Sequence, residues 1–108
     1  MKATKLVLAM TALFALVVPT LMAGTGEDAT ALFKSKCAMC HGPDGGGDTT
    51  MGKKFAIRDL RSDDVQKQTD EQLIEIMTKG KNKMPAYDGK IPVESMKFLV
   101  TVIRSFKK

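Results

Sequence analysis

The chain has 108 residues, of which 44% are apolar and 27% are charged. This length accommodates one domain, and this composition is that of a globular protein rather than of a disordered or fibrous one. Lysine and arginine (17) exceed aspartate and glutamate (12), which gives a formal charge of +5. The basic residues are scattered and form no continuous run, so the sequence predicts no binding of nucleic acid.

The first element of the chain has the layout of a secretory signal peptide. Two lysines precede an apolar run, residues 6–18, which is shorter than the about 20 residues that span a bilayer. Pro19 interrupts the run, and small residues follow from Ala23 onward, as they do at a cleavage site. We expect residues 1–23 to be the signal peptide, cleaved after Ala23, and residues 24–108 to form the domain.

Export implies a periplasmic protein that has no membrane span once the signal is removed. Leu21 stands where a small residue is preferred before cleavage, so an uncleaved N-terminal anchor is the alternative interpretation. The remaining domain is small, and domains of this size usually depend on a disulfide, a metal or a cofactor for stability.

The first helix is predicted over residues 28–39. Thr25 begins a T-x-x-D start signal, and Lys34 and Lys36 lie in the last turns, where positive charge suits the helix dipole. Three residues at helical spacing give this segment an apolar stripe: Ala29, Leu32 and Phe33.

The only two cysteines, Cys37 and Cys40, lie at the end of this segment and just after it, and the only histidine, His41, follows them directly. A disulfide here would close a very small loop and stabilise the domain little. A thioredoxin-like pair requires a βαβ context that the chain lacks, and a zinc site requires four ligands where only three exist. Two cysteines on one turn can instead form thioethers with two vinyl groups of one porphyrin, while the histidine reaches its iron. The motif therefore predicts one covalently bound haem c.

The rest of the chain is predicted to contain two further helices. Residues 42–68 are expected to be mostly loop, because glycines cluster at their start, and such a segment suits a close wrap around a flat ring. The second helix starts at Thr69, whose T-D-E-Q sequence is a capping box, and ends at Gly80. The third begins at Pro92 and runs through Phe106. No strand-like alternation persists, so the predicted fold class is all-α with three main helices.

A second axial ligand for the iron has to be a methionine, because the chain has no second histidine. Met39 is held between the two cysteines, and Met77 and Met96 lie on apolar helical faces that indicate core positions. Met84 lies in a polar loop outside any periodic run, and Pro85 forces it toward extended backbone. We expect the thioether of this loop methionine to bind the iron from the far face.

Two alternatives remain open for the distal face. Met51 follows the glycine-rich stretch, and ten extended residues span about 33 Å, so chain length does not exclude it. Met84 would otherwise be a loop methionine tucked against the core. Ligation by a thioether favours ferrous iron and blocks the site to small molecules, which is typical of an electron carrier.

These motifs resemble those of the class I c-type cytochromes, in particular the small single-haem bacterial type. The resemblance covers residues 26–106, and it rests on the segments 37–45 (CAMCHGPDG), 80–87 (GKNKMPAY) and 98–106. It implies the cytochrome c fold, in which three main helices and their loops wrap around one covalently bound haem. For the site, it implies Cys37 and Cys40 as the thioether residues, His41 as the proximal ligand and Met84 as the distal ligand.

The resemblance also implies that the N- and C-terminal helices cross, which would bring Ala29 and Phe33 against Leu99 and Val102. The family often has an aromatic residue where Val102 stands, so we expect a less tightly packed crossing here. Many relatives carry a proline near Thr50, in the loop whose carbonyl accepts the proximal histidine N–H. Threonine at this position leaves that acceptor unidentified.

The predicted function is that of a soluble periplasmic electron-transfer protein, not an enzyme, whose iron cycles between Fe(III) and Fe(II) with both axial ligands bound. We expect a monomer that meets redox protein partners, its donor and its acceptor. Lysines in the loops around the haem would steer partners with acidic docking patches: Lys53, Lys54, Lys79, Lys81, Lys83 and Lys90. A solvated surface is the alternative interpretation of these lysines.

Two other functions remain open on the sequence. A ligand-binding or gas-sensing c-type haem protein would leave the distal face open, which the Met84–Pro85 pair disfavours. A haem subunit of a larger membrane oxidoreductase complex is the second, and an uncleaved anchor or a large exposed apolar patch would favour it.

Overall fold

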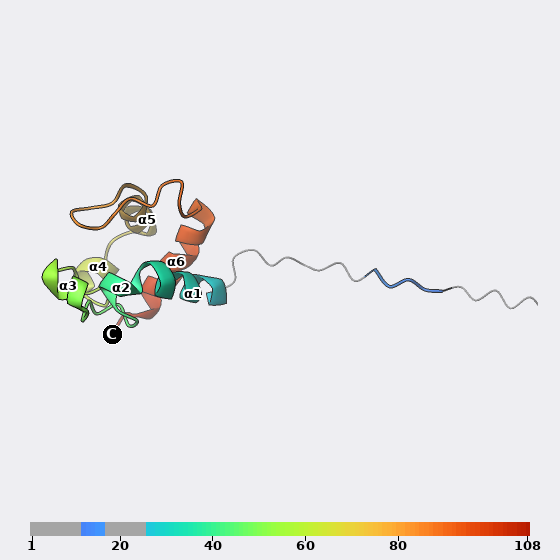
Figure 1. Cartoon of the computed structure of the whole chain (residues 1–108), viewed down its shortest axis with the longest axis horizontal. Helices are drawn as coiled ribbons and strands as arrows, with labels where there is room; N and C mark the ends of the chain where they lie inside the picture. Colours follow the sequence, from blue (N-terminus) through green and yellow to red (C-terminus); the bar gives the residue numbers. More distant parts are fainter. Residues whose placement is uncertain (1–11, 17–25) are drawn as a thin grey trace, which may run out of the picture.

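The computed structural model describes residues 12–16 and 26–108. Within this part the chain forms helices and a single isolated bridge, which confirms the predicted all-α class (Figure 1). Three helices have ten residues or more, as expected, and three shorter ones join them. In chain order they are α1 (Gly26–Lys36), α2 (Ala38–His41), α3 (Thr50–Lys54), α4 (Asp63–Gln66), α5 (Asp70–Lys79) and α6 (Val93–Ser105).

Most of the predicted signal peptide, and Thr25 with it, lies outside the described residues. Residues 12–16 are described; they form no regular secondary structure, and Leu13, Phe14 and Leu16 are exposed. Among the described residues, no helix combines the length and the apolar character that crossing a bilayer requires.

The prediction of one helix over residues 28–39 was wrong, because two helices meet there. Cys37 stands between α1 and α2 with φ −117° and ψ −35°. Backbone hydrogen bonds still bridge the break: Cys37 N–H donates to the Phe33 carbonyl (2.8 Å), and His41 N–H donates to the Cys37 carbonyl (2.9 Å). The helix is therefore interrupted at the first cysteine, while backbone hydrogen bonds join the two parts.

The core forms where α6 packs against both α1 and α5. Ala29 and Phe33 of α1 are buried in one cluster with Leu99 and Val102 of α6, as the resemblance implied. The aromatic partner missing at position 102 is supplied one turn later, since the rings of Phe33 and Phe106 lie 5.1 Å apart at 59°. The expected packing of the first helix against the last is confirmed, and its aromatic contact is made by Phe106 instead of by residue 102.

The segment 42–68, predicted as mostly loop, contains α3 and α4. Each begins at a hydroxyl side chain that accepts a backbone N–H, as N-cap residues do: Thr49 accepts from Gly52 (2.8 Å), and Ser62 accepts from Val65 (3.4 Å). These caps allow helices of only four or five residues to form.

The end of α3 turns the chain sharply. Ala56 N–H donates to the Lys53 carbonyl (3.3 Å), and Ile57 N–H donates to the Gly52 carbonyl (3.1 Å). This pair of bonds is the Schellman motif, and Ala56 occupies its left-handed position at φ 48°. The turn leads directly into Ile57 and Arg58, which line the cavity described below.

The other two predicted helices are confirmed. The capping box of α5 is complete, since Thr69 Oγ1 accepts from Gln72 N–H (3.1 Å) and Gln72 Oε1 accepts from Thr69 N–H (2.9 Å). Arg104 of α6 binds the link between α4 and α5 through the carbonyls of Gln66 (2.7 Å) and Gln68 (2.5 Å) and the carboxylate of Asp70 (2.9 Å). This clamp joins the middle segment to the core.

Candidate functional site

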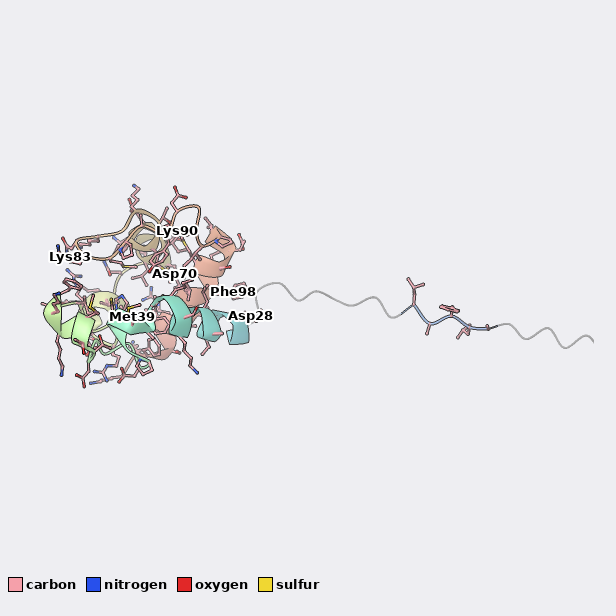
Figure 2. The ribbon with its side chains drawn as sticks, in the orientation of Figure 1. Asp28, Met39, Asp70, Lys83, Lys90 and Phe98 are labelled. Carbon is pink, nitrogen blue, oxygen red and sulfur yellow. The ribbon has the colours of Figure 1, made fainter. Side chains whose placement is uncertain are left out.

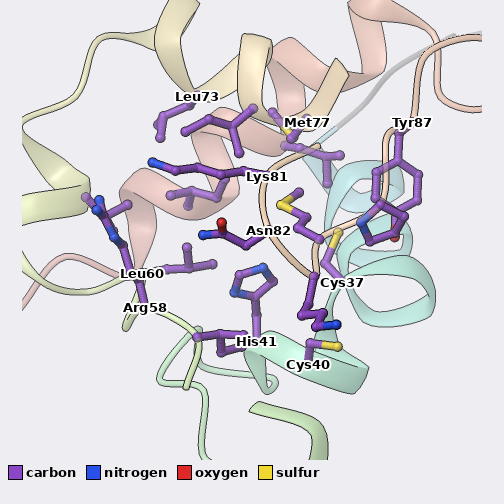
Figure 3. Close-up of a pocket in the computed structure, with 18 of the residues that line it drawn as sticks. Cys37, Cys40, His41, Arg58, Leu60, Leu73, Met77, Lys81, Asn82 and Tyr87 are labelled. Carbon is purple, nitrogen blue, oxygen red and sulfur yellow. The ribbon is translucent and has the colours of Figure 1, made fainter. Parts of the chain in front are cut away.

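A cavity lies between α2, the segment after α3, α5 and the loop that follows α5 (Figure 3). Its walls are mostly apolar, and they come from all three main helices and the segments between them: Phe33, Phe55, Ile57, Leu60, Val65, Leu73, Ile76, Met77, Leu99 and Ile103. An apolar cavity with a few polar side chains is the usual form of a cofactor site.

Both cysteines and the histidine that the sequence proposes as haem-binding residues line this cavity. Cys37 and Cys40 are half-buried and carry free thiols. Burial, and then the neighbouring Cys40, raise the pKa of the Cys37 thiol to about 11, so that thiol is protonated at neutral pH. The two sulfurs lie on the same side of the cavity as one another, next to the imidazole of His41 (Figure 3).

The segment that follows α2 is fixed to α2 by hydrogen bonds to the carbonyl groups of its last two residues. Thr49 Oγ1 donates to the Cys40 carbonyl (2.7 Å), and Gly47 N–H donates to the His41 carbonyl (2.7 Å). At Gly52 of α3, a Cβ atom would lie 2.6 Å from the Cys40 oxygen and would overlap the Gly47 oxygen. Only a glycine lets α3 approach α2 this closely.

Burial lowers the pKa of His41, which favours the neutral imidazole, the form that binds metals. The ring projects from α2 into the cavity (Figure 3). Its Nδ1 atom is buried and has no hydrogen-bond partner in the described part of the chain. An unpaired buried polar atom costs about 1–3 kcal/mol. The carbonyl group that would accept a hydrogen bond from the His41 ring, which the sequence left unidentified near Thr50, is therefore not found among the described residues. The nearby Thr49 hydroxyl already donates its hydrogen bond to the Cys40 carbonyl.

Met84 lines the same cavity and is carried by a tight turn. Lys81 N–H donates to the Met84 carbonyl (3.1 Å), and Met84 N–H donates to the Lys81 carbonyl (2.9 Å), with Asn82 at φ 54° between them. Residues paired in this way direct their side chains to one face, and both Lys81 and Met84 line the cavity. The approach is again close, because a Cβ atom on Gly80 would lie 2.6 Å from the Met84 oxygen.

Tyr87 fastens this loop to the rest of the molecule, a role that the sequence analysis missed. Its hydroxyl donates to the carbonyl of Lys36 (3.2 Å), the residue before the first cysteine, and its N–H donates to the Met77 carbonyl (2.9 Å). Burial raises the pKa of the phenol, and the two cysteines add to this. Tyrosine after a Met-Pro pair was the available signal, but its partner is 51 residues away.

The five methionines after residue 24 separate clearly by position. Met39 is 71% exposed (Figure 2), Met96 is 1% exposed in the core, and Met51 does not line the cavity. Met77 and Met84 both line it, but Met77 is fixed on α5 and is 6% exposed. The structure therefore brings Met84 together with the predicted residues, and adds Met77 as a methionine that the sequence assigned to the core alone.

This set of donors fits the expected haem. Two thiols stand beside an imidazole on one wall, and a thioether comes from the turn on another. Apolar side chains line the space between them, as the faces of a flat porphyrin require. Among the described residues, no three His, Cys, Asp or Glu side chains converge to hold a metal ion by themselves.

Comparison with known proteins agrees with this geometry. A family model described as cytochrome c oxidase, cbb3-type, subunit III, matches residues 24–101. The solved structure of the KustC0563 c-type cytochrome is 34% identical, with a TM-score of 0.69, and the match covers 74% of this chain and 98% of that one. A tyrosine-to-phenylalanine mutant of that protein is 35% identical, with a TM-score of 0.67, over 74% and 99% of the two chains. No curated protein matches.

Proposed function

The chain belongs to the family described as cytochrome c oxidase, cbb3-type, subunit III, and from that premise we propose that it is a monomeric single-electron shuttle of the periplasm. It is a class I c-type cytochrome with an all-α fold, and its cofactor is a covalently bound haem c. Haem-based electron transfer is the activity of the domain. The residues that hold the haem, the location and the free-carrier role are the proposed parts.

We assign the covalent bonds to Cys37 and Cys40. Each thiol S–H adds across one vinyl double bond, which gives a thioether and no second product. Two features support the assignment: both sulfurs are free, and both line the cavity beside the imidazole. A pair of bonds three residues apart would hold one edge of the porphyrin against α2.

We assign the axial positions to His41 and Met84. The observation that carries the proposal is that these two side chains line one cavity from separate walls, α2 and the turn at residues 81–84. Figure 3 shows Lys81 and Asn82 of that turn on the opposite side of the cavity from α2. Met77 is the weaker candidate because its side chain is packed into the core from α5.

The haem supplies a one-electron Fe(III)/Fe(II) couple. The chain's own contribution is to hold both axial groups in place and to keep water away from the apolar faces. A neutral His41 and a fixed Met84 leave no position for an external ligand, so the protein exchanges electrons and not ligands. This is why we propose a carrier and not an enzyme or a gas sensor.

Lysines near the cavity support an acidic redox partner. Lys53 and Lys79 are paired with Asp48 (2.9 Å) and Glu75 (2.8 Å). Lys83 has no ion pair with any described residue, and Figure 2 shows it projecting from the loop after α5. Unpaired positive charge beside the cofactor would raise the rate of encounter with an acidic surface, and the effect falls with salt.

The family description also favours a second role, as a haem subunit of a larger oxidoreductase complex. Size-exclusion chromatography of the native periplasmic extract separates the two roles. A free carrier elutes at the mass of one chain, whereas a subunit elutes with partner chains. Intact mass of the same material tests the signal peptide, because cleavage after Ala23 leaves residues 24–108 plus one haem, and an anchor leaves all 108 residues.

A matched pair of methionine variants tests the axial assignment. Met84→Ala should retain covalent haem but open the distal position, so that the ferrous protein binds carbon monoxide. Met77→Leu removes the other cavity-lining sulfur at nearly constant volume, and it should leave the spectrum and the resistance to carbon monoxide unchanged. Carbon monoxide binding in the Met77 variant alone would overturn the assignment.

A further inference from the structure

The charged residues that line the cavity are all of one sign. Four are basic, Lys36, Arg58, Lys81 and Lys83, and the lining includes no aspartate or glutamate. In a chain with 12 acidic residues, this arrangement indicates that the cavity receives an anionic group.

Two of the four basic residues lie away from the attachment cysteines. Figure 3 shows Arg58 and Lys81 at the end of the cavity remote from Cys37 and Cys40. Lys36 precedes the first cysteine directly, and Lys83 lies over the ring of Phe55, 6.0 Å from its centre. The cavity thus has one end that carries both thiols and another end at which Arg58 and Lys81 lie.

A protoporphyrin has the same polarity. Its two vinyl groups, which become the thioethers, lie on the edge opposite its two propionate carboxylates. We propose that Arg58 and Lys81 bind the haem propionates, so that these two cations fix the second edge of the ring. The inference rests on the proposed attachment at Cys37 and Cys40, because that attachment sets which edge faces the cations.

Both cations are available for this role. Neither Arg58 nor Lys81 forms an ion pair with any residue in the described ranges, and both side chains are exposed at the rim. The neighbouring Arg61 differs, because it already binds the carboxylates of Asp59 (2.9 Å) and Asp44 (3.3 Å). The guanidinium of Arg61 is therefore already occupied by two carboxylates, whereas the guanidinium of Arg58 has no carboxylate partner among the described residues and lies beside the cavity.

The backbone fixes both cations by tight turns. Arg58 follows the left-handed turn at Ala56, and Lys81 shares a paired turn with Met84. Because Lys81 and Met84 direct their side chains to one face, a thioether aimed at the iron brings the lysine to the same ring. The two interactions are thus coupled by geometry.

The proposal predicts how the haem titrates. A cation beside a carboxylate favours its ionised form, so Arg58 and Lys81 should hold the propionate pKa values low. Lys36 of α1 and Lys83, from the same turn as Lys81, act in the same direction, and burial lowers the pKa of His41. Reduction removes one positive charge from the iron, and this raises the pKa of the propionates. The reduction potential therefore falls with pH only between the propionate pKa of the oxidised protein and that of the reduced protein.

The experiment measures the reduction potential of the holoprotein between about pH 4 and pH 9. In Arg58→Gln and Lys81→Gln, the pH-dependent step should move upward by about one pH unit. Lys53→Gln is the matched control, since Lys53 is paired with Asp48 and does not line the cavity, and it should titrate as the wild type does. Arg58→Lys keeps the charge and should restore the wild-type profile.

Each outcome decides a different claim. If the wild type carries haem c with an intact sulfur-to-iron band and both glutamine variants titrate like the control, the propionate site is overturned and the carrier function stands. If the wild type carries no haem c, the proposed function fails, and the inference fails with it. Should one glutamine variant not mature, the other decides: an upward shift of its pH-dependent step supports the site, and a titration like that of Lys53→Gln rejects it.

Discussion

The proximal and distal walls of the haem cavity are built by different means. On the proposed proximal side Cys37 directly precedes α2, whose last two residues are Cys40 and His41, and bonds to the carbonyls of these two residues come from residues less than ten positions away. On the distal side Met84 stands on a turn that is anchored by Tyr87 to Lys36, 51 residues away in sequence.

This contrast shows which contacts control each ligand. The proposed proximal ligand, His41, is placed by its own short segment, so changes there should abolish the cofactor site or the fold around it. The proposed distal ligand is placed by long-range contacts, so changes far from Met84 should weaken the proposed bond to iron while the covalent haem remains.

The largest effect is expected at the proximal ligand. His41→Ala should yield no stable holoprotein, because the haem would lose its proximal bond and the cavity its only imidazole. Haem staining and the optical spectrum of the periplasmic fraction measure this. Met39→Ala is the control, since Met39 lies in the same segment but is 71% exposed; it should mature normally. An unaltered spectrum in the His41 variant would reject the proximal assignment.

The close packing of α3 on α2 should be the next most sensitive feature. Gly52→Ala places a Cβ atom 2.6 Å from the Cys40 carbonyl, and backbone atoms cannot give way as a flexible side chain would. We expect a loss of roughly 2–3 kcal/mol in the free energy of unfolding, measured with guanidinium. Gly89→Ala meets nothing within 4 Å and should cost only about 1 kcal/mol for its left-handed backbone. The reverse order would contradict the account.

A smaller effect, limited to the distal wall, is expected for Tyr87→Phe. The variant loses the 3.2 Å bond to Lys36, which contributes about 1 kcal/mol to stability. The sulfur-to-iron band of the oxidised protein should weaken while haem content stays at the wild-type level. Loss of haem attachment with an intact band would show that this tyrosine serves the proximal wall instead.

The smallest effect should be a gain in stability. Ala56 adopts φ 48° at the end of α3, where glycine is normally favoured. Ala56→Gly relieves this strain, partly offset by the greater freedom of glycine in the unfolded chain, and should stabilise the holoprotein by about 0.5 kcal/mol. Guanidinium unfolding measures the gain. A destabilised variant would mean that the left-handed turn is not a source of strain.

The elements that the sequence predicted correctly are those with local signals. The capping box at Thr69 and the apolar face of the last helix led to the correct helices, because caps and periodicity act within a few residues. The break at Cys37 and the helices α3 and α4 were missed. Their start signals were present at Thr49 and Ser62, but a helix of four or five residues has almost no periodicity to detect.

Long-range contacts explain the rest of what sequence could not predict. The sequence predicted the site residues Cys37, Cys40, His41 and Met84 from motifs, and all four line one cavity in the structure. The ring contact of Phe33 with Phe106 and the bond from Tyr87 depend on how distant segments meet. Arg58 carried no motif, and only the shape and charge of the cavity distinguish it from other surface arginines.

The most direct test of the account is the optical spectrum of the exported protein, oxidised and reduced, from cells with haem c maturation machinery. Ligation by His41 and Met84 predicts a sharp six-coordinate ferrous spectrum and a weak long-wavelength sulfur-to-iron band in the ferric state. A haem c spectrum without that band would contradict Met84 as the distal ligand, and the absence of haem c would contradict the electron-carrier function itself.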